Sequence, residues 1–456
     1  MMTFPSSPPD ASRPKPWVFP STVVRTLSNG VQVAVVRMPA LPIVTVRWCF
    51  LSGRLHEVPD KTGTGFLLQR LLRHGTADFN SSDLARHLDR RGIRLGTQVS
   101  VDSAVVSVSA LREYLGEAIH IANDVAFKPL LPESALAVER IRALQLHQQA
   151  TSQVEAMANL WMSHSLYGDH PYGRPVTTRA GLKNASIDDL RALHAQICDP
   201  SRSMLIVVGD VEPDEVVDVL ARRVSGLKAA PSCAAWSPPP APTCQPQVLL
   251  VERPGAEQVA MGVGALTMPR SHPDFLALRT VNHILGGGAS SRLFTELRER
   301  QGLTYGVYSQ LDCGLWGGDL TASMSVAPDK VGRAIGALSA QMERMGTGDV
   351  APAELDAATD YLVGSFPQRA SGLAGVSSLS MAAWLHQLPV SVWRDYQATL
   401  QAITMDDVEA AARRWLSPDR LCWVAAGSPE VLDKYLPEFQ TLGGPVQRVE
   451  MASLVD

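Results

Sequence analysis

The sequence predicts an α+β fold built from two homologous α/β-sandwich domains, in tandem duplication, with mostly antiparallel sheets. Three observations support this expectation. Strand-like and helix-like segments follow one another without strict βαβ alternation. A proline-rich segment divides the 456 residues into halves of similar length. Finally, short blocks of the first half recur in the second, and a chain of this length exceeds one ordinary domain.

The proline-rich segment is expected to be an extended linker covering residues 227–247. Proline lacks a backbone N–H and fixes its own φ angle, so such a stretch forms neither a helix nor a central strand. Its prolines are Pro231, Pro238, Pro239, Pro240, Pro242 and Pro246. We therefore expect an N-terminal domain at 21–226 and a C-terminal domain at 248–445. Residues 1–20, rich in Pro and Ser, are expected to be disordered.

Two blocks of residues recur in the same order in both halves. In one block, Ser186 and Thr404 each precede two aspartates, as helix N-caps do, and the offset is 218 residues. The same offset relates Pro200, Arg202 and Gly209 to Pro418, Arg420 and Gly427. An offset of 210 relates Arg90, Gly92, Gly96 and Asp102 to Arg300, Gly302, Gly306 and Asp312. Two ordered coincidences of this kind indicate a duplication.

The periodicity of apolar residues predicts the individual elements of the first half. Strands are expected where β-branched and apolar residues gather, and helices where apolar residues recur every three or four positions. The expected strands are Val31–Arg37, Ile43–Leu51 after the Pro42 turn, and Gln98–Ala110; the expected helices are Gly65–Leu72, Glu113–Phe127 and the one that Pro132 opens and that carries Glu139.

Composition excludes several classes of function. The formal net charge of −4, with no basic run, argues against binding to nucleic acid or to an anionic membrane. No apolar run is long enough for a membrane span. The six cysteines are scattered without a CxxC pair, so a thiolate metal site is not expected. The N-terminus does not read as a signal peptide, and the cytoplasm is the simplest expected compartment.

Four motifs give the chain a specific resemblance. They are Asn29-Gly30-Val31, Ser52-Gly53-Arg54, the run Tyr167–Pro175 (YGDHPYGRP) and the run Gly286–Phe294 (GGGASSRLF). Together with the order of the elements, they resemble the pitrilysin/insulinase family of zinc metallopeptidases, and in particular its bacterial, processing-peptidase-like branch. The matching features extend from about Val23 to Leu436.

Active members of that family carry the motif H-x-x-E-H on a helix just before a Gly-Thr pair. The two His side chains bind zinc, and the Glu polarises the attacking water. Here the helix before Gly75-Thr76 has Gly65, Leu68 and Gln69 at those positions. The resemblance places the third ligand at Glu139, for which an ordinary helix-face Glu beside Arg140 and Arg142 is the alternative. We therefore expect no metal in this chain.

The resemblance also implies a substrate-gripping Arg/Tyr pair in the second half, which falls on Arg298 and Tyr305. Arg offers a forked cation to a peptide carbonyl, and Tyr a phenol near a developing oxyanion. The first half has Leu88 and Leu95 at the matching places. The alternative, which the spacing alone also fits, is that Arg298 is a solvated charge on a helix and Tyr305 a half-buried strand residue.

Three consecutive glycines, Gly286, Gly287 and Gly288, begin the last of the four motifs. No Lys-Ser/Thr follows them, so a phosphate-binding loop is not expected. They are expected to form a turning or flexible start of a helix, or part of a substrate-binding edge.

The resemblance therefore predicts the non-metal-binding subunit of a heterodimeric zinc peptidase. Its partner would be a homologous chain with an intact H-x-x-E-H motif, holding the zinc, and its substrates would be unfolded peptides, which can add to an exposed sheet edge. The alternative is a catalytically inert structural or peptide-binding subunit, like the core proteins of respiratory complexes.

Overall fold

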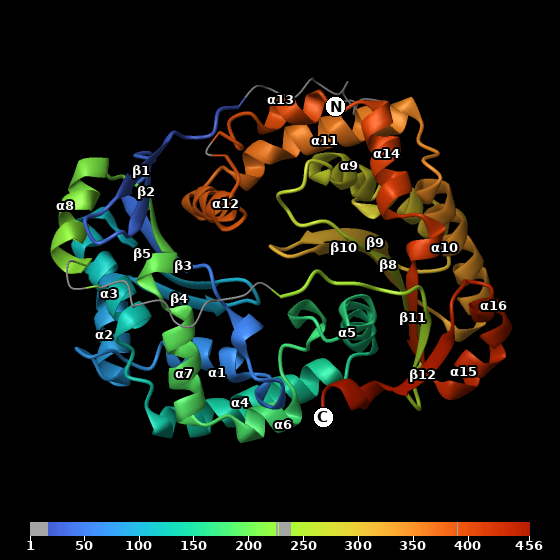
Figure 1. Ribbon diagram of the computed structural model, residues 1–456, viewed down its shortest axis with the longest axis horizontal. Helices are drawn as coiled ribbons and strands as arrows, with labels where there is room; N and C mark the ends of the chain where they lie inside the picture. Colours follow the sequence, from blue (N-terminus) through green and yellow to red (C-terminus); the bar gives the residue numbers. More distant parts are fainter. Residues whose placement is uncertain (1–16, 225–226, 228–238, 390) are drawn as a thin grey trace, which may run out of the picture.

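A computed structural model of the chain describes residues 17–224, 227, 239–389 and 391–456, and it contains two six-stranded sheets on opposite sides of the molecule (Figure 1). The first sheet has the order β1 (Thr22–Thr26), β2 (Gln32–Arg37), β6 (Ser203–Gly209), β3 (Ile43–Phe50), β5 (Ala104–Leu111), β4 (Arg94–Val99). The second has the order β12 (Val446–Glu450), β7 (Val248–Glu252), β11 (Cys422–Gly427), β8 (Val259–Thr267), β10 (Gly318–Val326), β9 (Val307–Cys313).

The two sheets repeat one topology. In each, a parallel pair (β2 with β6, β7 with β11) is followed by three antiparallel pairings that end at an edge strand, β4 or β9. They differ at the other edge, where β1 is antiparallel to β2 but β12 is parallel to β7. This arrangement confirms the expected α+β fold with two related, mostly antiparallel sheets.

Local sequence signals explain why the halves match. Ser186 and Thr404 each form a capping box at the start of α7 (Ile187–Ile197) and α14 (Met405–Trp415), bonding the N3 aspartate in both directions. Gly92 and Gly302, equivalent at the offset of 210, both have a left-handed backbone, with φ of 63° and 59°. Because a side chain is disfavoured there, glycine ends the helical segment in each half.

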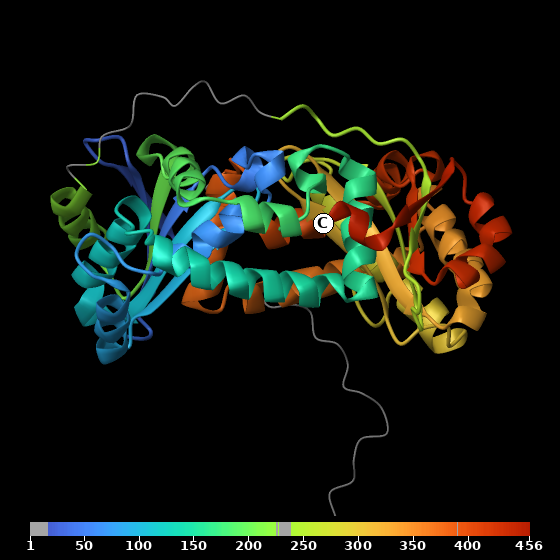
Figure 2. The ribbon, with the colours of Figure 1, turned by 90° about the horizontal axis from the view of Figure 1, so that it is seen from below.

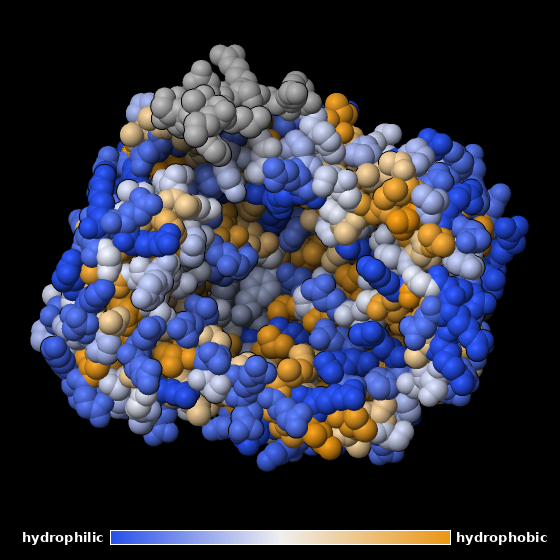
Figure 3. Space-filling model, turned by 180° about the vertical axis from the view of Figure 1, so that it is seen from behind, coloured by the Kyte–Doolittle hydropathy of each residue, from blue (hydrophilic) through white to orange (hydrophobic). Residues whose placement is uncertain are grey.

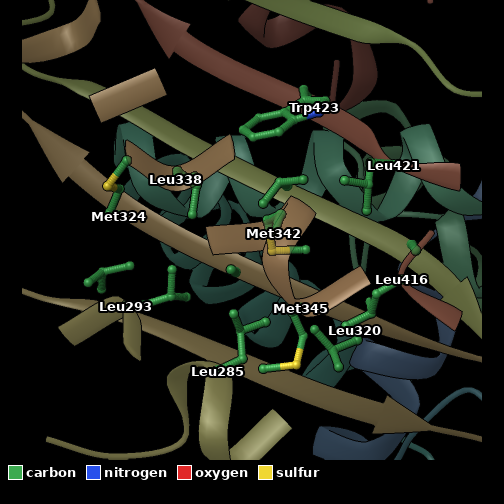
Figure 4. Packing of buried hydrophobic residues seen from close by; sticks show 14 of the residues in the cluster. Leu285, Leu293, Leu320, Met324, Leu338, Met342, Met345, Leu416, Leu421 and Trp423 are labelled. Carbon is green, nitrogen blue, oxygen red and sulfur yellow. The ribbon is translucent and has the colours of Figure 1, made fainter. Parts of the chain in front are cut away.

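Helices cover both faces of each sheet (Figure 2). One face of the first sheet packs against α1 (Thr64–Leu71), α3 (Leu115–Phe127), α7 and α8 (Pro213–Val224). The matching face of the second packs against α9 (Phe275–Gly286), α10 (Val331–Gly346) and α14. Figure 4 shows this second core, in which Leu285, Leu338 and Met342 are fully buried among side chains that include Leu320 and Trp423.

Each half also lends helices to the other half's sheet. The apolar face of α5 (Val154–Tyr167), with Trp161, Met162 and Leu166, packs on β7, β8 and β11 of the second sheet. In return, α12 (Leu373–Leu385) packs on β3 and β6 of the first sheet, and α11 (Pro352–Arg369) and α13 (Tyr396–Gln401) belong to the same apolar cluster. Figure 1 shows α12 lying towards the first sheet and α5 towards the second. The remaining helices are α2 (Ser81–Arg91), α4 (Glu133–Thr151), α6 (Arg179–Asn184), α15 (Pro429–Lys434) and α16 (Leu436–Gln440).

Three expectations about local structure need correction. The expected strand Gln98–Ala110 is a hairpin, because β4 ends at Val99 and β5 begins at Ala104. The second sheet continues past residue 445, since β12 ends at Glu450. Of the segment 1–20 expected to be disordered, residues 1–16 lie outside the described residues, but Trp17 and Phe19 pack against Phe366 and its neighbours.

Part of the expected linker also lies outside the described residues, namely 228–238. The described end of it is anchored, because Cys244 Sγ lies 2.8 Å from Cys422 Sγ in β11. Among the described helices, none is both long and apolar enough to cross a membrane.

Candidate functional site

The helix α1 carries the three positions at which related active enzymes would hold a metal and a general base. Leu68 is 1% exposed and belongs to the core of the first half. The Gln69 side-chain oxygen accepts a hydrogen bond from the Val99 N–H at 3.0 Å. The Gln69 backbone carbonyl accepts one from the Thr97 hydroxyl. These residues therefore bind α1 to the core and to the edge strand β4.

The space beside Gly65 is occupied by a buried ion pair. A Cβ atom added at Gly65 would lie 2.7 Å from Arg54 Cγ and 3.1 Å from Glu57 Oε1. The Glu57 carboxylate accepts hydrogen bonds from the Gly65 N–H (2.6 Å) and the Gly63 N–H (3.3 Å) at the start of α1. It lies 3.8 Å from Arg54 Nη1. Burial raises the pKa of Glu57, although Arg54 and the two N–H groups favour its charged form.

Glu139 lies on α4 and is 3% exposed, yet its carboxylate is fully engaged by cationic neighbours. It pairs with Arg70, with Arg142 at 2.8 Å and with His74 at 3.2 Å. Burial alone would raise the pKa of Glu139, but the hydrogen bonds from these partners lower it below its usual value. Glu139 is thus a helix residue held in a buried ion-pair cluster, and Arg142, named in the alternative, is one of its partners.

These residues do not fit a zinc ion. Gly65 offers no donor atom, Leu68 offers an alkyl chain, and the Gln69 and Glu139 oxygens are already used by protein partners. Zinc sites need three or four N, S or O donors around one point. Within the described part of the chain, one other group of potential ligands lies together, namely Asp78, His120 and Asp124.

The two residues of the Arg/Tyr pair lie in a helical segment of the second half and on the anchored loop that follows it. Arg298 is exposed in the helical segment Phe294–Arg300, with its guanidinium 4.4 Å from the centre of the Phe294 ring. The loop that follows is tied back by the Gly302 N–H to Arg298 O (3.1 Å) and by the Thr304 hydroxyl to Ser325 O (2.7 Å). A rigid loop of this kind can present a side chain without ordering it on binding.

Tyr305, at the tip of that loop, is 95% exposed. It is neither half-buried nor in a strand, since β9 begins at Val307. It lines a cavity of about 290 Å³ together with Tyr308, Glu155 and Asn159, the last two from α5. At the equivalent places of the first half, Leu88 and Leu95 pack against the core. The polar pair is thus exposed where its counterparts are apolar and packed.

The three glycines end a helix, which corrects the expected helix start. Gly286 is the last residue of α9, and the chain turns before the next helical segment. A Cβ atom at Gly286 would lie 2.4 Å from the Ser309 backbone N of β9. Glycine therefore lets α9 approach the edge strand of the second sheet.

The motif Tyr167–Pro175 joins the two halves. Tyr172 Oη donates a hydrogen bond to Asp102 Oδ2 (2.5 Å) and accepts one from the Leu315 N–H (2.9 Å) in the second half. Tyr167 Oη donates to Asp319 Oδ2 at 2.8 Å, again across the halves. The sequence marked this motif as specific but gave no sign that its tyrosines bridge the two sheets.

With this geometry in view, two family models match the chain. Residues 32–179 match the model described as insulinase, peptidase family M16, and residues 184–362 match the model described as the peptidase M16 inactive domain. The chain belongs to the M16 family. An M16 inactive-domain match over α9, β9 and Tyr305 is consistent with a second half that carries no metal motif.

Curated relatives of this M16 chain carry different names. An uncharacterized zinc protease of Mycobacterium leprae is 27% identical over 405 residues, covering 86% of this chain and 88% of that one. A protein of Helicobacter pylori named a non-peptidase homolog is 24% identical over 270 residues, covering 59% of this chain and 62% of that one.

Solved structures of M16 proteins share the fold. A peptidase M16 inactive domain from Pseudomonas fluorescens matches with a TM-score of 0.83 at 24% identity, covering 90% of this chain and 98% of that one. A protease from Helicobacter pylori matches with a TM-score of 0.82 at 19% identity, covering 89% and 99%. At these identities the likeness concerns the fold of the whole two-sheet unit.

Proposed function

We propose that this M16 chain is the non-metal-binding subunit of a heterodimeric zinc peptidase. It would contribute Arg298 and Tyr305 to a zinc site on a homologous partner with an intact H-x-x-E-H motif. The observation that carries the proposal is a contrast within the chain: the metal positions of α1 are filled by Arg54, Glu57 and core packing, while Tyr305 is 95% exposed on an anchored loop.

The chemical role of the pair follows from its side chains. An exposed guanidinium can donate two parallel hydrogen bonds to a peptide carbonyl, and a phenol can donate one to an oxyanion as negative charge develops. The zinc would be held by the partner, and this chain would bind and orient unfolded peptide against it.

Co-expression with a homologue that carries H-x-x-E-H tests the pairing. We expect the two chains to copurify through a tag on either one, and to cleave a quenched fluorescent unfolded peptide only together. Metal analysis should find one zinc per pair. A homodimer of this chain that alone cleaves peptides and holds one zinc per chain would refute the proposal.

Variants of the pair test the assigned roles. Arg298→Ala and Tyr305→Phe should each lower kcat/KM of the assembled enzyme by about a hundredfold, as loss of an oxyanion donor does, without affecting copurification. Arg298→Lys should restore only part of the rate, since an ammonium lacks the planar fork. Arg333→Ala, on exposed α10 surface, is the matched control and should keep full activity.

An inert structural or peptide-binding subunit is the second candidate, and the Helicobacter relative named a non-peptidase homolog favours it. The same variants separate the two candidates. If Arg298→Ala and Tyr305→Phe leave the rate and KM of an active pair unchanged, the chain serves as a scaffold.

A further inference from the structure

A cavity of about 870 Å³ lies in the second half, between α9, α11 and the edge strand β9. Each helix presents one face to it: Phe275, Arg279 and Asn282 of α9, and Tyr361, Ser365 and Arg369 of α11. The space-filling view from behind shows the molecular surface hollowed near its middle (Figure 3). The volume is in the range of pockets that bind organic ligands or peptide side chains.

Three arginines line this cavity, namely Arg270, Arg279 and Arg369. Arg270 lies over the Phe275 ring at 3.4 Å, and Arg279 lies 5.7 Å from the Tyr396 ring centre. Neither these two nor Arg369 forms an ion pair with a carboxylate among the described residues. Stacking on aromatic rings orients a guanidinium but leaves its N–H groups free for an anion.

The electrostatic environment of the cavity is positive. Burial, together with the nearby charges of Arg279 and Arg369, lowers the pKa of Arg270 to about 10 against the opposing effect of Tyr396 and Cys313. Asp312, the acidic residue of the lining, accepts a hydrogen bond from Gln310 at 2.7 Å. Two partly buried guanidinium groups, Arg270 and Arg279, and the exposed Arg369 share the cavity with a single carboxylate, that of Asp312. The lining therefore keeps a positive balance that attracts an anion, and the low-dielectric walls reduce screening.

The cavity also runs along a sheet edge. β9 pairs with β10 alone, as the outer strand of the second sheet, and its residues 309–313 line the cavity. An extended peptide beside such a strand directs alternate side chains to one side, at the spacing of a strand. A small free anion would need neither a strand edge nor a cavity of this size.

We propose that this cavity binds acidic side chains of an extended peptide, with Arg270, Arg279 and Arg369 holding the carboxylate. The proposal deepens the peptide-binding role proposed above and rests on it. The proposal assigns a substrate class. Unfolded peptides whose bound segment places an Asp or Glu in this cavity should bind more tightly than the same peptides with Asn or Gln.

The isolated full-length chain allows a direct test by fluorescence anisotropy. The probes are two labelled unstructured peptides of about ten residues that differ only by Glu or Gln at one central position. We expect the Glu peptide to bind at least about tenfold more tightly, as expected for a charge-assisted hydrogen bond. This preference should shrink at high salt.

Variants locate the binding. Arg369 is exposed, so Arg369→Gln should not disturb folding. Arg279 is less exposed, and Arg279→Gln tests the deeper part of the cavity wall. Each should weaken the Glu peptide about tenfold and leave the Gln peptide unchanged, whereas the control Arg333→Gln should change neither. Circular dichroism of Arg279→Gln checks that the chain is folded.

Equal affinity for the two peptides, or a Glu preference that survives both variants, would overturn the proposal. The proposal would also be overturned if inorganic triphosphate bound in a way that depends on Arg369 and the Glu peptide did not bind. The ligand of the cavity would then be a free anion. Because binding is measured on the chain alone, an inactive reconstituted pair would refute the peptidase proposal without touching this one.

Discussion

Gly65 leaves no room for an imidazole at the position of α1 where the resemblance to zinc peptidases places a metal ligand. Any side chain there meets Arg54 Cγ at 2.7 Å, and the Arg54 side chain is itself only 10% exposed. At the position where the resemblance places a metal, the first half has the Arg54–Glu57 ion pair, and Glu57 caps the start of α1. Restoring H-x-x-E-H by substitution would require this pair to move.

Gly65→Ala should consequently destabilise the chain by about 1–3 kcal/mol, the usual cost of overpacking a core. In an Arg54→Ala background the same substitution should cost much less, because the space is then free. Chemical denaturation of the four proteins of this cycle measures the coupling. Gly116→Ala in α3 is the control, since nothing lies within 4 Å of its added Cβ, and it should be slightly stabilising.

Equal costs of Gly65→Ala in the two backgrounds would show that Arg54 does not fill the position.

Asp319 predicts a pH dependence. Burial, together with the charge of Asp312, raises the pKa of Asp319 to about 7, although a hydrogen bond from Tyr167 opposes the shift. The unfolded carboxyl has a pKa of about 3.9. Between these values the folded state keeps a proton that the unfolded state has lost, so this group's contribution to stability falls as pH rises from about 4 to 7.

Thermal melts across that range should therefore show a smaller decrease in Tm for Asp319→Asn than for the unmodified chain. Asp356→Asn, at an exposed position of α11, is the control and should follow the unmodified chain. An unchanged slope in Asp319→Asn would mean that Asp319 titrates normally.

Among the elements, the hydrogen-bonded tyrosines of the Tyr167–Pro175 motif hold the two halves together. Tyr172→Phe removes the hydroxyl that donates to buried Asp102 and accepts from the Leu315 and Trp316 N–H groups, while the Leu315 N–H keeps its bond to Asp102 Oδ2 at 3.1 Å. Loss of a hydrogen bond to a buried carboxylate costs about 1–3 kcal/mol, so the midpoint of urea unfolding should decrease. Tyr114→Phe should leave it unchanged, because the Tyr114 hydroxyl has no hydrogen-bond partner in the described structure. An unaltered midpoint for Tyr172→Phe would mean that water replaces these bonds at no cost.

The sequence predicted those elements whose signals are local. The helix N-caps at Ser186 and Thr404, and the strands before and after Pro42, depend on neighbouring residues and were predicted correctly. The turn between β4 and β5 was missed because it contains Ser100–Ser103 without glycine or proline, so the alternation of apolar residues continues across it. β12 was missed because its Gln and Arg side chains are exposed at a sheet edge.

For the candidate site, the sequence predicted residue types but not their surroundings. The loss of the metal motif follows from Gly65, Leu68 and Gln69 alone. The Arg54–Glu57 pair and the arginine-lined cavity depend on contacts between residues far apart in the chain. The single available signal for the cavity was Phe275, Arg279 and Asn282, whose spacing puts an arginine on the buried face of a helix.

At the scale of the whole molecule, the exchange of helices makes the two halves interdependent. Among the described residues, the apolar face of α5 packs on the second sheet, and α12 packs on the first sheet with α11 and α13 in the same apolar cluster. Each half has a core of its own, but separating the halves would expose both of these apolar surfaces. We expect fragments 1–238 and 239–456 to be poorly folded separately and to form the native structure when co-expressed.

Calorimetry of the full chain should then show one unfolding transition, whereas independent halves would give two. Circular dichroism and amide exchange of the separate fragments provide the second measurement. A fragment that folds cooperatively alone, with protected strands, would contradict this interdependence.

The position of α5 in the chain also affects how the protein is made. Its apolar residues Trp161, Met162 and Leu166 leave the ribosome long before β11, the last of the strands on which they pack, which ends at Gly427. At about 5–20 residues per second, synthesis of the intervening chain takes on the order of ten seconds to a minute. Throughout that time the apolar face of the nascent helix is exposed and can associate with other proteins. We therefore expect a chaperone to shelter that face during translation.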